Sequence, residues 1–224
     1  MIVICTHQSP QVLERMLSSI KRCEQVPHRI AVVETSDSQV SKPIADEFGC
    51  LFTNTELKYE IGAYNHAMNE FPDEDEYFMF QDSLEMMQPG WEYHYRELSH
   101  GQKMVAMCTY TLLEDPCPLC GKKEFESLYG MEWPLSDATA VLSNCFYIPQ
   151  SAKRKLKEFG IDRLVANDKN DTYATERVLG AIAHYTCGFD KVATILGDYI
   201  WHVDRFIDNT GFTIYIQKYI LRRQ

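Results

Sequence analysis

Three short apolar runs that each stop at polar residues limit most strongly what this chain can fold into. The runs cover residues 1–6, 30–33 and 77–80, and each is followed directly by polar side chains. Between the first two, apolar residues recur at spacings of three and four over residues 13–20, which predicts a helix. Strands joined through helices are typical of a parallel sheet. Because such sheets bind ligands beyond the carboxyl ends of their strands, we expect a site where these runs end.

The rest of the sequence continues the alternation, and it predicts an α/β fold. We expect one domain with a mixed, mostly parallel central sheet flanked by helices, since 224 residues suffice for one sizeable core. The further helices that we expect cover residues 43–48, 62–71, 91–99, 151–159 and 173–184, with a near-helical pattern over 212–223. The further strands cover residues 50–52, 104–110, 140–148 and 192–196, and residues 113–132 form a turn-rich insertion.

The net charge and the hydropathy of the chain exclude some of the molecules that it could bind. The formal net charge is −10, whereas a nucleic-acid binder needs a basic surface to meet phosphates. No apolar stretch reaches the length of a membrane span. The chain opens directly into a core strand without a signal peptide, and its eight cysteines are scattered, so we expect a cytoplasmic protein with reduced thiols.

Cys117 and Cys120 form the only closely spaced cysteine pair of the sequence. Their Cys-x-x-Cys spacing has the shape of one zinc knuckle, but structural zinc sites usually combine two such pairs. We therefore expect a reduced pair in a turn, with structural zinc as the less favoured alternative.

Four blocks of the first hundred residues resemble glycosyltransferases of the GT-A type, in particular those of family 2. The blocks are Val-Ile-Cys-Thr-His-Gln at residues 3–8, Ala-Val-Val-Glu-Thr-Ser-Asp at 31–37, Gly-Ala-Tyr-Asn at 62–65, and the stretch from Phe-Met-Phe-Gln-Asp-Ser to Pro-Gly-Trp at 78–91. Their order and spacing are similar to those of the family. The resemblance implies a GT-A-like (Rossmann-related) fold, with a nucleotide-sugar-binding half at 1–100. It also implies an acceptor-binding half and C-terminal helix at 101–224.

The resemblance implies that the chain moves a sugar from a nucleoside-diphosphate donor to a hydroxyl of a glycan, lipid or protein acceptor, with inversion. The turn after the first strand would offer donors to the nucleotide at a helix N-terminus. The acids after the second strand would accept hydrogen bonds from the base or ribose, and the glycine at the helix start would permit close backbone approach. The residues implied in nucleotide-sugar binding are Thr6, His7, Gln8, Glu34, Asp37, Gly62, Asn65 and Asp82.

A divalent cation, Mn²⁺ or Mg²⁺, is implied at Asp82, with His202 as a further ligand. There the cation would bridge the two phosphates and act as a Lewis acid for the leaving group. The sequence departs from the family here, because Gln81-Asp82-Ser83 keeps one carboxylate where the usual Asp-x-Asp motif has two. Tyr64 also replaces the usual arginine. A strand-end turn acceptor is the alternative role for Asp82, and a satisfied strand histidine is the alternative for His202.

Inversion requires a base that takes the proton of the acceptor hydroxyl. The family places a carboxylate at a helix start beyond the acceptor pocket, and Glu176 fits that place, with Asp137 in reserve. An acid near a helix start is also stabilised by the helix dipole, so a structural role for Glu176 stays open.

Two other functions compete with glycosyl transfer. A sugar-phosphate nucleotidyltransferase would carry a Gly-rich loop with Arg and Lys after the first strand, which residues 7–10 lack. A catalytically degenerate module that binds a nucleotide sugar without turnover is the stronger alternative, because the acidic motif is incomplete.

Overall fold

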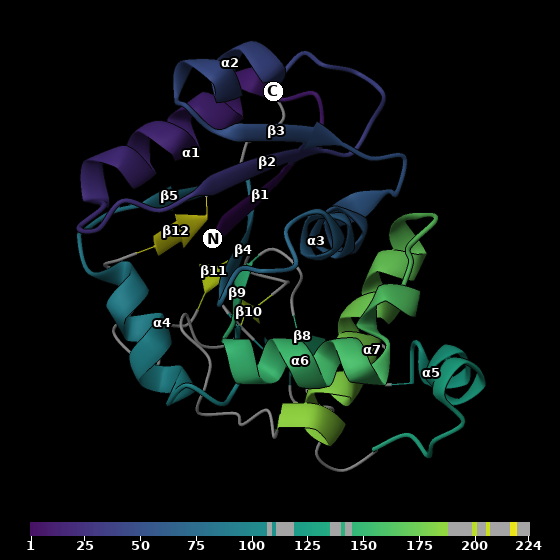
Figure 1. Ribbon diagram of the computed structural model, residues 1–224. Helices are drawn as coiled ribbons and strands as arrows, with labels where there is room; N and C mark the ends of the chain where they lie inside the picture. The colour runs from purple at the N-terminus through teal and green to yellow at the C-terminus, as the bar shows by residue number, and fades with distance from the viewer. Residues whose placement is uncertain are drawn as a thin grey trace.

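The computed structural model describes residues 1–106, 109–110, 119–134, 140–141, 145–187, 199–200, 205–206 and 216–218. In chain order, the elements of the first hundred residues are β1 (Ile2–Thr6), α1 (Pro10–Cys23), β2 (Ile30–Glu34), α2 (Lys42–Glu47), β3 (Leu51–Asn54), α3 (Tyr59–Glu70), β4 (Tyr77–Gln81), β5 (Leu84–Met86) and α4 (Trp91–Ser99) (Figure 1). The later elements are β6 (Val105–Ala106), β7 (Thr109–Tyr110), α5 (Lys122–Tyr129), β8 (Ala140–Val141), β9 (Cys145–Ile148), α6 (Gln150–Phe159), the 3-10 helix η1 (Ile161–Arg163), α7 (Lys169–Cys187), β10 (Tyr199–Ile200), β11 (Arg205–Phe206) and β12 (Ile216–Lys218).

A six-stranded mixed sheet in the order β3-β2-β1-β4-β9-β6 forms the centre of the fold. The strands β3, β2, β1 and β4 are parallel, and β9 runs antiparallel to β4 and β6. The prediction of a mixed, mostly parallel sheet in an α/β fold is therefore confirmed. The chain leaves β1 toward β2 and β3 on one side and returns to β4 on the other, so the order reverses beside β1. Such a switch point opens a crevice at the carboxyl ends of the strands.

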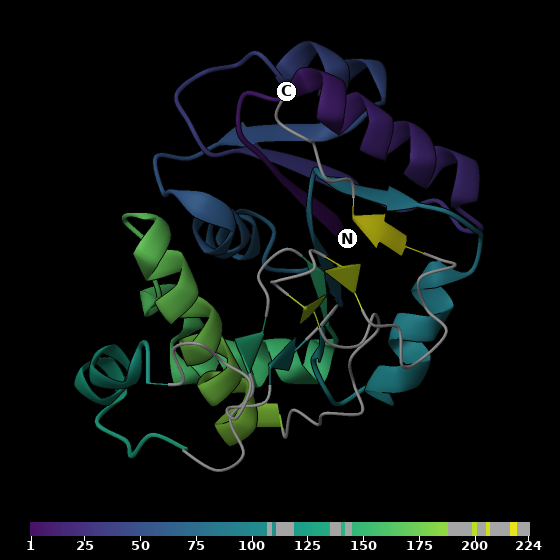
Figure 2. The ribbon, with the colours of Figure 1, turned by 180° about the vertical axis from the view of Figure 1, so that it is seen from behind.

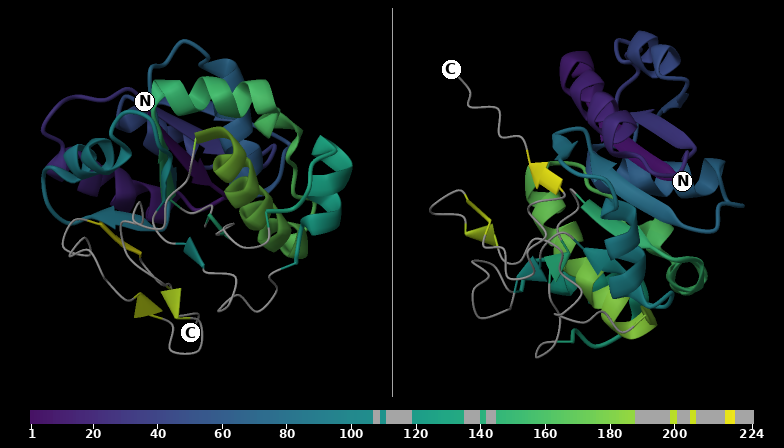
Figure 3. Two further views of the ribbon diagram at one scale, coloured as in Figure 1. Left: turned by 90° about the horizontal axis from the view of Figure 1, so that it is seen from below. Right: turned by 90° about the vertical axis from the view of Figure 1, so that its left-hand side faces the viewer.

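Helices cover both faces of the sheet, because successive side chains of a strand point to opposite faces. On β1, Ile2 and Ile4 join a core with α1, α2 and α4, whereas Val3 and Cys5 join a core with α3, α5, α6 and α7. Figures 1 and 2 show these two helical layers from the front and from behind. In the second layer, α7 packs against both α5 and α6 (Figure 3).

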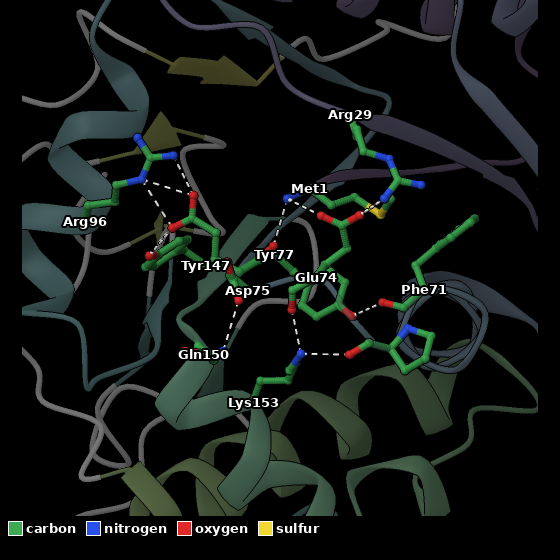
Figure 4. Close-up of polar contacts among 12 residues, drawn as sticks. Met1, Arg29, Phe71, Glu74, Asp75, Tyr77, Arg96, Tyr147, Gln150 and Lys153 are labelled. Carbon is green, nitrogen blue, oxygen red and sulfur yellow. Dashed lines mark hydrogen bonds and ion pairs between the residues drawn. The ribbon is translucent and has the colours of Figure 1, made fainter.

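The acidic turn before β4 fastens the amino-terminal edge of the sheet. Glu76 accepts hydrogen bonds from Arg96 and, at 2.6 Å, from the hydroxyl of Tyr147, while Glu74 pairs with Arg29. Lys153 of α6 donates to the carbonyl oxygens of the same turn (Figure 4). This network joins α4, α6 and β9 to the start of β4, at the opposite edge from the predicted site.

Three predictions for the second half are wrong. The insertion at 113–132 contains a helix, α5, because Lys122–Tyr129 turns Phe125 into the core. The near-helical pattern at 212–223 does not form a helix over Ile216–Lys218, which is a strand paired antiparallel with β5. Cys120 is disulfide-bonded rather than reduced, while Cys5, Cys23, Cys50 and Cys145 are not disulfide-bonded.

Other predictions lie outside the part of the chain that the structure describes. They include the strand at 192–196 and Cys117. In the described residues, no helix combines the length and the apolar character needed to cross a membrane.

Gly62 allows α3 to pack directly on the turn that precedes it. A Cβ atom at this position would lie 2.7 Å from Cβ and 2.9 Å from the carbonyl carbon of Leu57. We therefore expect Gly62→Ala to lower the free energy of unfolding by about 2 kcal/mol, the usual cost of overpacking. Urea unfolding measures this change. Asn69→Ala, on the exposed side of the same helix, serves as the control and leaves the stability within about 0.5 kcal/mol. Equal stability of Gly62→Ala and wild type would contradict the close packing.

Candidate active site

A cavity of about 920 Å³ opens at the carboxyl ends of β1, β2 and β4. Its volume lies in the range of small-molecule and cofactor sites. The predicted crevice is therefore present, at the point where the strand order reverses. The lining residues come from five segments: Cys5, Thr6, His7 and Ser9; Thr35, Ser36 and Asp37; Glu56, Lys58, Tyr59 and Glu60; Gln81 and Asp82; and Lys169 and Thr172.

Asp82 lies in this cavity, directly after β4, and is held by β1. Its Oδ2 accepts a hydrogen bond of 2.7 Å from Oγ1 of Thr6, and its N–H donates to the carbonyl oxygen of Cys5 at 3.0 Å. Burial, together with the negative charges of Glu60 and Glu34, raises the pKa of Asp82 to about 6 against the opposing effect of the hydrogen bond from Thr6. Thr6 and Asp82, both predicted site residues, are thus brought together.

Glu60 is a cavity residue that the sequence reasoning missed. One of its oxygens accepts a hydrogen bond from Nε2 of Gln81, whose Oε1 in turn accepts from Ser83 at 3.1 Å. The other oxygen, Oε2, is buried and has no hydrogen-bond partner among the described residues. The only signal in the sequence was its position two residues before Gly62, just ahead of the predicted helix, and acids are common near helix starts.

Glu34 lies behind the cavity wall rather than in it. Its side chain is fully buried and accepts hydrogen bonds from the N–H of Gln8 at 2.6 Å, from Ser41 at 2.6 Å and from Ser36 at 3.4 Å. The carboxylate therefore joins the turn after β1 to the loop after β2 and to the start of α2. Both carboxylate oxygens of Glu34 accept hydrogen bonds from protein donors. We call this a bracing position, because the carboxylate holds three segments together.

The turn after β1 presents His7 but not Gln8 to the cavity. Nδ1 of His7 lies 3.1 Å from Oγ1 of Thr35, and both residues line the cavity together with the exposed Asp37. Gln8 has φ = 52° and points its N–H toward Glu34. Tyr59, another cavity residue, has φ = 60°. Left-handed backbone at a non-glycine residue is strained, and such strain often accompanies functional sites.

Gly62 and Asn65 support α3 and do not line the cavity. Gly62 packs against Leu57, as described above. Nδ2 of Asn65 donates to the carbonyl oxygens of Ile161, at 3.2 Å, and Leu164, at 2.9 Å. Asn65 is thus buried at the junction between α3 and the segment that leads to α7.

Positive charge reaches the cavity from two lysines. Tyr64, at the position of the family's arginine, is buried edge-on against Phe146 and does not line the cavity. Lys58, before α3, and Lys169, at the start of α7, both line it. Neither ammonium group has an ion-pair partner among the described residues, so both are available to an anionic ligand.

Of the predicted catalytic residues, the structure describes Glu176 alone. Glu176 is 8% exposed, on α7 one turn beyond Thr172, and it does not line the described cavity. Asp137 and His202 lie outside the described residues.

The carboxylates of the cavity fit a divalent cation in part. Within the described residues, no group of three or more His, Cys, Asp or Glu side chains is placed to hold a metal ion. Mg²⁺, however, is usually bound through one or two carboxylates together with the phosphates of its substrate. The carboxylate of Asp82 and the unpartnered oxygen of Glu60 are donors of the right kind for such a shared site.

The fold is similar to that of solved glycosyltransferase structures. An active-site mutant of LgtC matches with a TM-score of 0.50 and 12% identity, over 81% of this chain and 69% of that chain. Glucosyl-3-phosphoglycerate synthase from Mycobacterium tuberculosis, in complex with Mn²⁺, uridine diphosphate and glucosyl-3-phosphoglycerate, matches with a TM-score of 0.48 and 12% identity, over 84% and 80%. Mouse xyloside xylosyltransferase 1 matches with a TM-score of 0.46 and 10% identity, over 80% of each chain.

At these identities the likeness concerns the fold alone. No family model matches the sequence, and no curated protein matches it either.

The bracing position of Glu34 predicts a large effect on stability. We expect Glu34→Ala to lower the free energy of unfolding by about 3 kcal/mol, because it leaves the hydroxyl of Ser41 and the N–H of Gln8 without their acceptor. Asp37→Ala, at the exposed rim of the same loop, is the control and stays within about 0.5 kcal/mol. Urea unfolding of both variants tests this, and a Glu34→Ala protein as stable as wild type would exclude the bracing role.

With a chelator present, the carboxyl group of Asp82 makes the free energy of unfolding depend on pH. Its pKa of about 6 in the folded state, against 3.8 ordinarily, means that the folded chain binds a proton that the unfolded chain has already released. This contribution to stability is lost as the pH rises from about 4 to about 6. We expect the stability of wild type relative to Asp82→Asn to fall over this range, measured by urea unfolding with a chelator present. A difference that does not change with pH would contradict the raised pKa.

Proposed function

We propose that this chain is a glycosyltransferase that transfers a sugar from a nucleoside-diphosphate donor bound in the cavity. The observation that carries the proposal is the pairing of Asp82 with Thr6 at the switch point of the sheet, inside a cavity that two unpaired lysines also line. The carboxylates of this cavity can bind a cation or accept hydrogen bonds from hydroxyl groups of a ligand. Its ammonium groups can bind the phosphates of a ligand. LgtC, described as a galactosyltransferase, shares the fold and is consistent with this function.

The donor would lie across the ends of β1, β2 and β4. The turn after β1 would meet the nucleotide through Thr6 and His7, and Asp37 would accept hydrogen bonds from the ribose or base. Lys58 and Lys169 would face the diphosphate, because they are the unpaired cations of the described cavity. Gln8, Glu34, Gly62 and Asn65 would act indirectly by holding the loops and helix that carry these residues.

Asp82 would hold a divalent cation, Mn²⁺ or Mg²⁺, against the diphosphate. A bound cation would supply Lewis-acid stabilisation of the leaving diphosphate. Thr6 fixes the carboxylate by occupying Oδ2, so the group is oriented before the ligand binds. His202 remains our proposed additional ligand.

The acceptor would be a glycan, lipid or protein hydroxyl. In an inverting transfer, the acceptor oxygen forms a bond to the anomeric carbon, the bond from that carbon to the diphosphate breaks, and a base takes the acceptor's proton. We propose Glu176 as this base, with Asp137 in reserve, because α7 brings Lys169 and Thr172 to the cavity and carries Glu176 one turn further.

A degenerate module is the second candidate. It would bind the nucleotide sugar without turnover. The incomplete acidic motif favours it, as does the lack of a three-residue metal cluster in the described part of the chain.

Donor hydrolysis without acceptor distinguishes the two candidates. The purified chain is incubated with UDP-, GDP- and dTDP-sugars in the presence of Mn²⁺, Mg²⁺ or a chelator, and release of the nucleoside diphosphate is measured. We expect one donor to be cleaved in a cation-dependent way, and Asp82→Asn to reduce cleavage by about 100-fold or more. Asp73→Asn, in the acidic turn at the opposite edge, is the matched control and should leave the rate unchanged.

The other outcomes separate the hypotheses. Nucleotide binding without cleavage of any donor would favour the degenerate module. Cleavage that persists with chelator would remove the cation from the proposal, and unchanged cleavage by Asp82→Asn would remove Asp82.

A further inference from the structure

We propose that the disulfide bond of Cys120 is a reversible redox clamp, which in its oxidised form fixes the start of α7 beside the cavity. Cys120 ends the Cys-x-x-Cys motif at residues 117–120, which the proposed function does not use. The proposal rests on the proposed function only for its effect on donor binding, because it concerns the regulation of that same site. The bond and the packing of α5 on α7 are properties of the fold.

Cys120 differs from the other cysteines whose side chains the structure describes. Cys5, Cys23, Cys50 and Cys145 form no disulfide bond, and all of them except Cys50 are buried. Cys120 is disulfide-bonded and partly exposed to solvent. Thiol–disulfide exchange requires access to the bond, and exposed disulfide bonds are more easily reduced than buried ones. We therefore expect this bond to break and form again without unfolding of the chain.

The surroundings of Cys120 favour the reduced, anionic form of its sulfur. Cys120 comes directly before Gly121, the N-cap of α5, and Lys122 and Lys123 are the first two residues of that helix. Helix N-termini and neighbouring lysines stabilise a thiolate. A stabilised thiolate is also the better leaving group when another thiolate attacks the disulfide bond.

Reduction is a balanced exchange with a dithiol. The first thiolate of the reductant attacks the disulfide bond, forms a mixed disulfide and releases one cysteine of the chain as a thiolate. The second thiolate of the reductant then displaces the other cysteine. The chain gains two electrons and two protons, and the dithiol becomes a disulfide. A disulfide oxidant reverses the exchange.

Gly121 connects the bond to α7. A Cβ atom at this left-handed position, with φ = 84°, would lie 2.7 Å from the carbonyl oxygen of Ala174 and 2.8 Å from Cγ2 of Val178. The backbone that follows Cys120 therefore lies directly on α7. A change in the position of this turn cannot leave the facing side of α7 unaffected, because the two are in close contact.

The other side of α7 belongs to the proposed site. Lys169 and Thr172, near the start of the helix, line the cavity, and Glu176, our proposed base, lies one turn further. Ala174 and Val178, which Gly121 contacts, stand two positions before and two positions after Glu176. The turn at Cys120 therefore supports the part of α7 that serves the cavity.

Two acids oppose the packing at this end of α5. Burial, and then the negative charge of Asp171 on α7, raises the pKa of Glu124. The far end of α5 is held by Tyr129, whose hydroxyl donates to the carbonyl oxygen of Gly160 at 3.0 Å. The disulfide bond therefore acts at the end of α5 where like charges favour separation from α7.

Hydrogen exchange of the full chain tests the clamp. Exchange of the α7 amides is compared by mass spectrometry between the oxidised chain and the chain reduced with dithiothreitol without denaturant. We expect faster exchange over α7 in the reduced chain, unchanged exchange over β1 and α1, and return to the first state on reoxidation. Equal exchange over α7 in both forms would overturn the proposal, as would a bond that dithiothreitol reduces only in denaturant.

Nucleotide binding gives the functional readout. Calorimetric titration with UDP, GDP and dTDP should show binding that is weaker by about fivefold or more in the reduced chain, at the lower end of typical allosteric coupling. Cys120→Ser should bind like the reduced chain and should not respond to dithiothreitol. If Cys120→Ser does not fold, the comparison of oxidised and reduced wild type decides by itself.

Cys50→Ser is the matched control. It removes a half-buried thiol that forms no disulfide bond, so its response to dithiothreitol should equal that of wild type. Loss of the response in Cys50→Ser would overturn the assignment to Cys120.

The clamp and the proposed function can fail separately. Reversible, redox-dependent exchange over α7, without cleavage of any donor by either form, would support the clamp and contradict the transferase. Donor cleavage at the same rate in the oxidised and reduced chains would support the transferase and overturn the clamp as a regulator of the site.

Discussion

The buried carboxylate of Glu34 is the interaction on which the cavity depends. It receives the N–H of Gln8 from the turn after β1, the hydroxyl of Ser36 from the loop after β2, and that of Ser41 at the start of α2. A loop that closes a crevice has no regular hydrogen-bond pattern of its own, so it must be fixed by side chains. Thr35 also bonds to Thr6 and His7, but Glu34 is the acceptor that these two turns share with the start of α2.

Acidic residues have different roles at the amino and carboxyl ends of the parallel strands. At the amino edge, Glu74 and Glu76 pair with Arg29 and Arg96 from distant elements, and this network stabilises the fold (Figure 4). At the carboxyl edge, Glu60 and Asp82 face a cavity with no such cations paired to them among the described residues. Acidic residues therefore act as structural partners at one edge and as available ligands at the other.

The parallel half of the fold was predictable because it is encoded locally. Apolar runs and helical spacing fix β1, α1, β2 and β4, and the carboxyl ends of these strands must then meet, which brings Thr6 and Asp82 within hydrogen-bond distance. The place of Glu60 in the cavity was not predictable, because it depends on how α3 packs rather than on its neighbours in sequence. The strand β12 was missed for a similar reason: its partner β5 is more than a hundred residues away, and tertiary pairing overrode the local helical pattern.

The amide of Asn65 has a consequence for the entropy of ligand binding. It fastens α3 to the carbonyl oxygens of Ile161 and Leu164, in the segment that leads into α7. Since Glu60 lies in the first turn of one of these helices and Lys169 begins the other, two lining segments of the cavity belong to one preorganised frame. A ligand that bridges them does not have to order two independent helices, so less of its interaction free energy is lost on binding.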